Sequence, residues 1–197
     1  MATRTFVAID LSPDVCDALD QAGRRIGQPP GSKIRWTPAR NMHLTLAFLG
    51  NVDDDVLADV CRTTRDVAAR ARPIEMTVRG IVPVPPAGRR LRMFWTGVEE
   101  TEPRLAPLVD DLQGALEPLG FPPETRAFRP HVTVARVRFT RNAGAVREAA
   151  LPWQQHEFGK TTARELVVYS SELTPKGPVY APLARAPLGE PDATQGE

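Results

Sequence analysis

Two short segments of the chain, residues 43–48 and 131–136, share the pattern His-[Leu/Val]-Thr-[Leu/Val]-Ala. They contain two of the three histidines and begin 88 residues apart, which is nearly half of the 197-residue chain. The alternation of polar and apolar residues in this pattern favours strands. A matched pair at this separation predicts two structurally similar lobes that each contribute one strand.

The spacing of the pattern places its polar residues together. Side chains on a strand alternate between two faces, so the histidine and the threonine of each copy share one face, and the apolar residues between them point into a core. If the two strands meet, four polar side chains surround one cavity: His43, Thr45, His131 and Thr133. This arrangement requires neither paired carboxylates nor a set of metal ligands.

Two imidazoles and two hydroxyls around a cavity are suited to in-line phosphoryl transfer. A neutral imidazole takes a proton from the attacking oxygen, a protonated one gives a proton to the leaving oxygen, and hydroxyls donate hydrogen bonds to the phosphate. Histidine suits both roles because its unperturbed pKa is about 6.5. Such chemistry proceeds without a metal when the leaving group is a strained ring alkoxide, as in a ribose 2′,3′-cyclic phosphate. A lone His-x-Thr more often marks a polar pair on a half-buried strand, and the second copy favours catalysis.

The sixth residue of each segment differs between the copies. Arg136 lies five places after His131, an odd offset that points away from the histidine face unless a bulge or the strand end intervenes. Phe48 holds the equivalent position in the first copy, where packing in the core is favoured over stacking on a base. The third histidine, His156, has no matching partner and is expected to serve in packing or on the surface.

The order of expected elements indicates an α+β fold with a mainly antiparallel sheet. Ser12 is expected to cap the first helix, with Pro13 in its first turn. Helices are expected over residues 13–26, 53–71, 103–119 and 143–149. Strands are expected over residues 5–11, 43–49 with an end at Gly50, 74–84, 91–98, 128–139, 165–173 and 179–183, with residues 34–36 leading to the second of them. The last residues, 189–197, are small and polar and are expected to form a flexible tail after one domain of residues 1–188.

Composition narrows the class of protein. Hydrophobic residues make up 42% and charged residues 25%, which indicates a folded globular chain. A formal charge of +1 excludes a large global field for nucleic acid, so any phosphate site must be local. The sequence has no signal peptide pattern and no apolar run long enough to span a membrane. The two cysteines, Cys16 and Cys61, fit no disulfide or metal pattern and predict buried free thiols in a cytoplasmic protein. A monomer is expected, because no feature of the sequence demands a larger assembly.

Four segments of the chain together resemble a known family. They are R-x-F-V-A-I-D-L at residues 4–11, N-x-H-L-T-L-A-F-L-G at 41–50, F-x-P-H-V-T-V-A-R at 128–136, and L-V-V-Y-S-S-E-L followed by G-P-V-Y within 166–180. The chain is therefore similar to the two-histidine phosphoesterases, and specifically to the RNA 2′,3′-cyclic phosphodiesterases, also called 2′-5′ RNA ligases. The resemblance implies a bilobal α+β fold. In it, two mainly antiparallel sheets related by pseudo-two-fold symmetry surround a central cleft, with helices on the outer faces.

The resemblance also implies roles for individual residues. His43 would be the general acid that protonates the ribose 3′ oxygen, and His131 the general base that activates water. Thr45 and Thr133 would hold the phosphate, and Arg136 would contact the substrate. The substrates would be RNA with 2′,3′-cyclic phosphate ends or 2′,3′-cyclic nucleotides, the products 2′-phosphates, and no metal or other cofactor would be required.

Two other functions stay open at this point. One is a ligase that joins tRNA halves reversibly through a 2′-5′ linkage. The other is a nucleotide- or RNA-binding module whose histidines only hold phosphate. The retention of both histidines and both threonines disfavours simple binding, because arginine or lysine would serve that purpose equally well.

Overall fold

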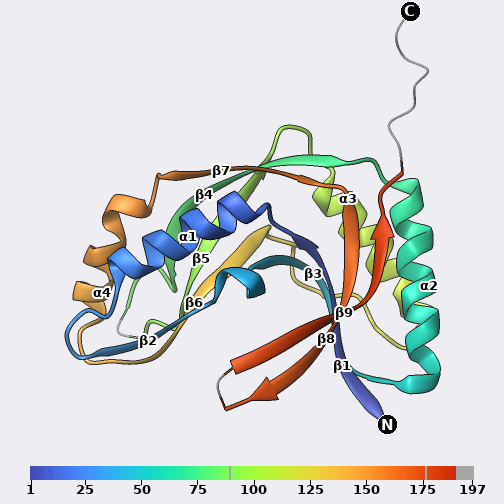
Figure 1. Ribbon diagram of the computed structural model, residues 1–197, viewed down its shortest axis with the longest axis horizontal. Helices are drawn as coiled ribbons and strands as arrows, with labels where there is room; N and C mark the ends of the chain where they lie inside the picture. The colour runs from blue at the N-terminus through green and yellow to red at the C-terminus, as the bar shows by residue number, and fades with distance from the viewer. Residues whose placement is uncertain (89, 176, 190–197) are drawn as a thin grey trace, which may run out of the picture.

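The computed structural model describes residues 1–88, 90–175 and 177–189, and within them nine strands form one curled antiparallel sheet (Figure 1). The strands are β1 (Ala2–Asp10), β2 (Ser32–Trp36), β3 (His43–Asp53), β4 (Ile74–Val84), β5 (Met93–Glu100), β6 (His131–Thr140), β7 (Glu157–Ala163), β8 (Glu165–Thr174) and β9 (Gly177–Pro187). The α-helices are α1 (Pro13–Ile26), α2 (Asp54–Arg70), α3 (Leu105–Leu116) and α4 (Ala143–Ala150), and short 3₁₀ turns are η1 (Ala39–Asn41), η2 (Glu117–Leu119) and η3 (Leu151–Trp153). In Figure 1, α1 and α4 lie toward one end of the sheet and α2 and α3 toward the other.

The strand order is symmetrical about one junction. It runs β7-β4-β5-β6-β3-β1-β8-β9, with β2 paired to β6 off this path. The strands at the centre, β3 and β6, are paired only through Leu44 and Val132. The predicted α+β class is confirmed, and the two expected antiparallel sheets are the two halves of one continuous sheet, joined by this residue pair.

Local sequence signals placed most elements within a few residues of their observed bounds. Helix α1 begins at Pro13 and ends at Ile26, as the sequence predicts. The expected cap is wrong in detail, because the Ser12 side chain makes no capping hydrogen bond. Its hydroxyl instead donates to the carbonyl of Lys160 on β7, at 3.2 Å. Ser12 therefore ties the start of the helix to a distant strand.

Three strands differ most from the sequence-based expectation, while β1 also begins earlier and β9 extends further at both ends than expected. Strand β3 continues through Gly50, which has a φ of +71°, because Gly50 and the residues after it pair with the start of β1. Strand β7 is missed by sequence reasoning, and it is held at the sheet edge by pairing with β4. Residues 32–36 form a separate strand on β6 rather than a lead into β3. In each case pairing with a remote segment overrides local preference.

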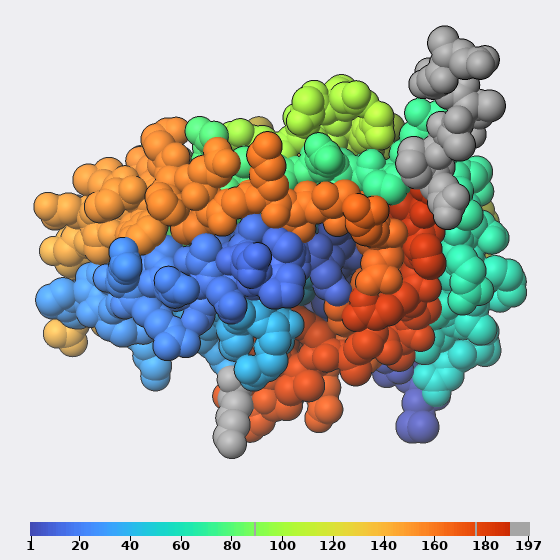
Figure 2. Space-filling view, turned by 45° about the horizontal axis from the view of Figure 1, so that its top comes forward, coloured from blue at the N-terminus to red at the C-terminus, as the bar shows by residue number. Residues whose placement is uncertain are grey.

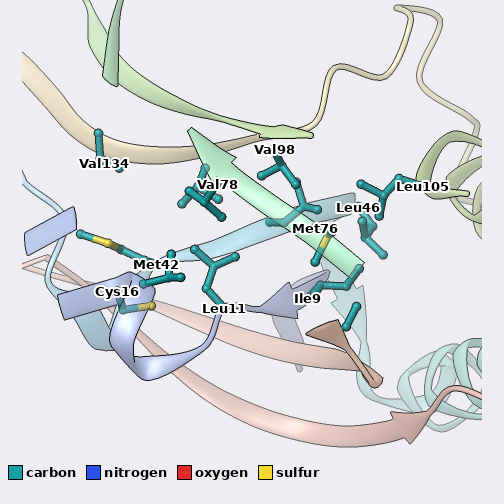
Figure 3. Close-up of a cluster of buried hydrophobic side chains, with 14 of the residues drawn as sticks. Ile9, Leu11, Cys16, Met42, Leu46, Met76, Val78, Val98, Leu105 and Val134 are labelled. Carbon is teal, nitrogen blue, oxygen red and sulfur yellow. The ribbon is translucent and has the colours of Figure 1, made fainter. Parts of the chain in front are cut away.

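The apolar residues of both motif strands are buried in one core (Figure 3). Leu46 and Val134, the fourth residues of the two segments, are 4% and 0% exposed. Helix residues such as Leu105 and Cys16 belong to the same core. The histidine faces of β3 and β6 therefore point away from this core.

The two halves of the chain interleave at the surface. In Figure 2 the N-terminal segment in blue lies against the orange segment that carries α4 and β7 and near the red C-terminal strands. Both cysteines are free, Cys16 buried and Cys61 half-buried. Gly189 donates a backbone hydrogen bond to Ala68 of α2 at 3.1 Å, so the first residue of the predicted tail is bonded to the domain, and residues 190–197 lie outside the described residues. No helix in the described part of the chain is long and apolar enough to cross a membrane.

Candidate active site

The site begins at the pair that joins β3 and β6. Leu44 and Val132 lie opposite each other in the register and are fully buried. Their neighbours on either side are the histidines and threonines of the two segments, which point to the other face. The junction therefore brings His43, Thr45, His131 and Thr133 together, as the sequence predicts, and all four line one pocket.

Both motif strands carry a bulge at the same position. On β3, Thr45 pairs with Ala8 and Ala47 with Val7, so Leu46 has no partner on β1. On β6, Thr133 pairs with Trp95 and Ala135 with Phe94, which leaves Val134 as the extra residue. An extra residue reverses the alternation of faces beyond it.

The bulges decide where the sixth residue of each segment points. Arg136 returns to the histidine face and lines the pocket. The bulge at Val134 is the irregularity that a residue five places after His131 needs in order to share its face. Phe48 also lines the pocket; the residue is 57% exposed, and the Arg4 guanidinium lies 4.6 Å from the centroid of its ring. The expectation that Phe48 packs in the core is wrong, because the bulge at Leu46 turns it outward.

This central pocket has a volume of about 610 Å³. Besides the predicted residues it is lined by η1, by β2 and by the β8–β9 hairpin. Five of its described lining residues are arginines and none is an aspartate or glutamate; the arginines are Arg4, Arg35, Arg40, Arg136 and Arg138. A chain with a net charge of +1 thus presents a strongly cationic pocket suited to an anion.

His131 has a defined tautomer. Its Nδ1 lies 2.8 Å from the carbonyl oxygen of Arg129, and a carbonyl can only accept. Nδ1 therefore carries a hydrogen, and the lone pair of the neutral ring is on Nε2. Trp95 stacks on this imidazole, with ring centroids 3.9 Å apart. The ring is held so that Nε2 is the nitrogen available for proton exchange.

His43 lies in a more enclosed aromatic setting. Phe6 stacks on it at 4.8 Å between centroids, and Tyr180 meets its ring edge-on at 5.2 Å. Burial lowers the pKa of His43, while a hydrogen bond with the Asn41 backbone and the nearby Asp10 carboxylate oppose that shift. The protonated form of His43 therefore depends on these two groups.

Asp10 is the cross-strand partner of His43 and is itself held by two neighbours. The hydroxyl of Tyr169 lies 2.8 and 2.9 Å from the two carboxylate oxygens, and Arg185 lies 3.6 Å from one of them. Arg185 also forms an ion pair with Glu165. Burial and the bond to Asp10 raise the pKa of Tyr169 well above its usual range, so Tyr169 stays protonated and donates to Asp10.

The β8–β9 hairpin closes one side of the pocket. Asn41 donates through its side chain to the carbonyl of Pro178 at 2.8 Å, which fastens the hairpin to η1. Gly177 packs so closely under the Arg35 guanidinium that a side chain there would collide with it. A second cavity of about 350 Å³ shares His43 and Tyr180 with this pocket and is also lined by Asp10.

Sequence reasoning missed several residues that surround the histidines. They are Asp10, Phe6, Trp95, Tyr169 and Tyr180. Phe6 and Asp10 belong to the opening segment that carried the family resemblance, and Tyr169 and Tyr180 to the closing one, so the signal was present without a role attached. His156 packs against Trp153 and Phe158 outside the pocket, as expected for a packing histidine. Within the described residues, no group of three or more His, Cys, Asp or Glu side chains is arranged to hold a metal ion.

Comparison with known proteins places the chain in a family. The chain matches the family described as LigT like Phosphoesterase over residues 9–95 and 97–180. It is 33% identical over 184 residues to a protein of Methanothermobacter thermautotrophicus named RNA 2',3'-cyclic phosphodiesterase, covering 91% of this chain and 96% of that relative. A protein of the same name from Thermotoga maritima is 32% identical, with 90% of this chain and 91% of the relative covered.

Solved structures share the architecture. The crystal structure of TT0787 from Thermus thermophilus has a TM-score of 0.76 at 28% identity, covering 94% of this chain and 97% of that one. Escherichia coli LigT complexed with 3'-AMP has a TM-score of 0.76 at 23% identity, over 95% and 99% of the two chains, and shares the fold. The family expected from the two motifs is confirmed: the chain belongs to the LigT-like phosphoesterases.

Proposed function

We propose that this chain hydrolyses 2′,3′-cyclic phosphate ends of RNA to 2′-phosphates without a metal ion. The observation that carries the proposal is the pair of His-x-Thr strands facing one cationic pocket with no carboxylate among its described lining residues. Family membership supports phosphoesterase chemistry. The relatives named RNA 2',3'-cyclic phosphodiesterase support this choice of substrate.

In the proposed reaction each histidine moves one proton. Water attacks phosphorus as Nε2 of His131 accepts its proton, and the bond from phosphorus to the ribose 3′ oxygen breaks as His43 protonates that oxygen. The Nδ1 hydrogen bond to Arg129 supports the role of His131 as base. Thr45 and Thr133 donate to the non-bridging oxygens, where charge builds in the transition state. A bound phosphate anion adds to Asp10 in favouring the imidazolium of His43.

The test is hydrolysis of 2′,3′-cyclic AMP in the presence of EDTA, with the product identified by phosphorus NMR. The expected product is 2′-AMP alone, and turnover is expected to be lost in both His43→Ala and His131→Ala. His156→Ala replaces the histidine outside the pocket and serves as the matched control, with thermal unfolding as the check on folding. Formation of 3′-AMP, inactivation by EDTA, or full activity in either pocket variant would each contradict the proposal.

The same samples separate the two other functions. A ligase would join RNA halves bearing 2′,3′-cyclic phosphate and 5′-hydroxyl ends at rates that compete with hydrolysis. A binding module would hold 2′,3′-cyclic AMP at saturation and show no turnover. In water, hydrolysis is favoured because the solvent is the more abundant nucleophile.

A further inference from the structure

The pocket contains arginines that a single reacting phosphate does not explain. On β2, Arg35 lies directly opposite Arg136 of β6 in the register, and Arg138 follows two residues later on the same strand. All three line the pocket that contains the histidines. Like charges directly opposite each other on neighbouring strands destabilise a sheet. This arginine cluster, Arg35, Arg136 and Arg138, therefore destabilises the sheet unless an anion binds it.

No carboxylate in the described part of the chain offsets that cost. Arg35, Arg136 and Arg138 form no ion pair with a described acidic residue, whereas Arg79 pairs with Glu157. Arginines left unpaired and gathered on one side of a pocket are suited to phosphate, which accepts several hydrogen bonds from a guanidinium.

The position of the cluster separates it from the reaction centre. Arg138 lies seven residues beyond His131 on β6. A strand rises about 3.3 Å per residue, so the two Cα atoms are roughly 20 Å apart. A phosphate held between the histidines is beyond the reach of the Arg138 guanidinium. Arg35 and Arg138 thus point to a second anionic group on the same ligand.

Apolar side chains beside the cluster favour a nucleic-acid strand as that ligand. Leu173 and Val179 of the β8–β9 hairpin are 70% and 53% exposed and line the same pocket. Proteins bind single strands by combining cations that follow the backbone with side chains that contact the bases, above all aromatic rings that stack on them. The exposed Phe48 lines this pocket as such a ring, and Leu173 and Val179 add apolar contact. The Arg35 guanidinium also lies against Gly177 at the start of β9, so cations and apolar surface adjoin.

We propose that Arg35 and Arg138 bind the phosphodiester that precedes the terminal nucleotide of an RNA strand whose cyclic end lies between the histidines. The inference rests on the proposed function and deepens it by assigning two residues to the phosphodiester next to the reacting end. It predicts that the enzyme prefers substrates with a phosphate on the 5′ side of the reacting nucleoside.

The test compares three substrates: 2′,3′-cyclic AMP, the same nucleotide with a 5′-phosphate, and the dinucleotide ApA with a 2′,3′-cyclic phosphate. The wild-type kcat/KM is expected to be highest for the dinucleotide. In Arg35→Gln and Arg138→Gln the ratio of kcat/KM for dinucleotide over mononucleotide should fall roughly tenfold, the size of a lost hydrogen bond to a charged group. The wild-type preference should also weaken as salt rises. Arg65→Gln, on the outer helix α2, is the matched control and should keep the wild-type ratio.

A ratio near one in the wild type, or an unchanged ratio in both variants, would overturn the inference. Cleavage of the 5′-phosphorylated mononucleotide as fast as the dinucleotide would overturn the assignment of these arginines to a phosphodiester within a strand, because a terminal phosphate would then serve equally well. Equilibrium binding of ApA 2′-phosphate, compared with 2′-AMP, measures the same preference without turnover. Failure of all hydrolysis would therefore count against the proposed function, while the binding ratio still decides the role of these two arginines.

Discussion

The two motif strands, β3 and β6, are alike in backbone and different in surroundings. Each carries histidine and threonine on the pocket face, and each has a bulge that turns its sixth residue into the pocket. Opposite the histidines, however, β1 places Asp10 against His43, while β5 places Gly97 against His131. The duplicated pattern supplies two equivalent imidazoles, and the neighbouring strands make them unequal.

The surroundings of the two histidines differ in burial and in charge. His43 is enclosed by Phe6 and Tyr180, and this burial lowers its pKa, but the Asp10 carboxylate acts against it. His131 has Trp95 on one side and a carbonyl on Nδ1. Burial therefore works against a proton on His43, and the Asp10 carboxylate across from it partly offsets that effect, so Asp10 is a group that supports His43 in the proposed role of acid.

The largest expected effect tests whether the two histidines act as one unit. His43→Ala and His131→Ala should each lower kcat for 2′,3′-cyclic AMP by about 10²–10⁴. The double variant should fall little further, because acid and base act in the same transition state and either loss leaves the other ineffective. Steady-state kinetics on the four proteins measures this. A double variant whose loss equals the product of the single losses would mean that the histidines act independently.

The threonines test whether the two halves hold the phosphate equally. Thr45→Val and Thr133→Val preserve shape and remove one donor each, so kcat/KM should fall by roughly 10- to 100-fold in either variant. Thr63→Val on α2 is the control outside the pocket. A loss in only one variant would show that the phosphate is held from one half, contrary to the symmetry of the backbone.

Asp10 tests the difference between the halves through the pH profile. The groups around His43 that carry or change charge are Asp10 on β1, Tyr169 on β8, Tyr180 on β9 and Arg40 on η1. Asp10→Asn removes a charge that raises the pKa of His43, so one limb of the bell-shaped kcat/KM profile should move to lower pH while the other stays.

The control for this profile is Glu165→Gln. Glu165 is the other carboxylate that pairs with Arg185, but it does not lie across from His43. Both limbs of the kcat/KM profile of this variant should match those of the wild type. Equal movement of both limbs in Asp10→Asn, or the same movement in Glu165→Gln, would assign the effect to the overall field rather than to His43.

The smallest effect concerns stability without substrate. Because burial lowers the pKa of His43 in the folded chain, the unfolded chain binds that proton at higher pH. Just below the ordinary value of 6.5 the unfolded state holds more protons, so the free energy of unfolding should fall as pH falls through this window. His43→Gln should flatten that fall, as measured by urea unfolding at pH about 7.5 and about 5. If the free energy of unfolding depends on pH identically in the variant and the wild type, the fall in stability does not come from His43.

Local sequence signals determined many elements. Pro13 at the first turn and apolar residues at helical spacing defined α1, and β-branched residues defined β4, with the ends that the structure shows. Strand β7 escaped prediction because its sequence, EFGKTTA, contains a glycine and lacks a strong apolar pattern. It is a strand because β4 offers an edge for its backbone to pair with.

For the site, the sequence by itself determined which side chains carry chemistry and that histidine and threonine share a face, because alternation is a property of any strand. It left open the direction of Arg136 and misplaced Phe48, since a bulge depends on how the neighbouring strand pairs. The contact between Leu44 and Val132, the bulges at Leu46 and Val134, and the carboxylate behind only one histidine were decided by tertiary structure. The reason is that each arises from pairing between segments far apart in the chain, which no local pattern encodes.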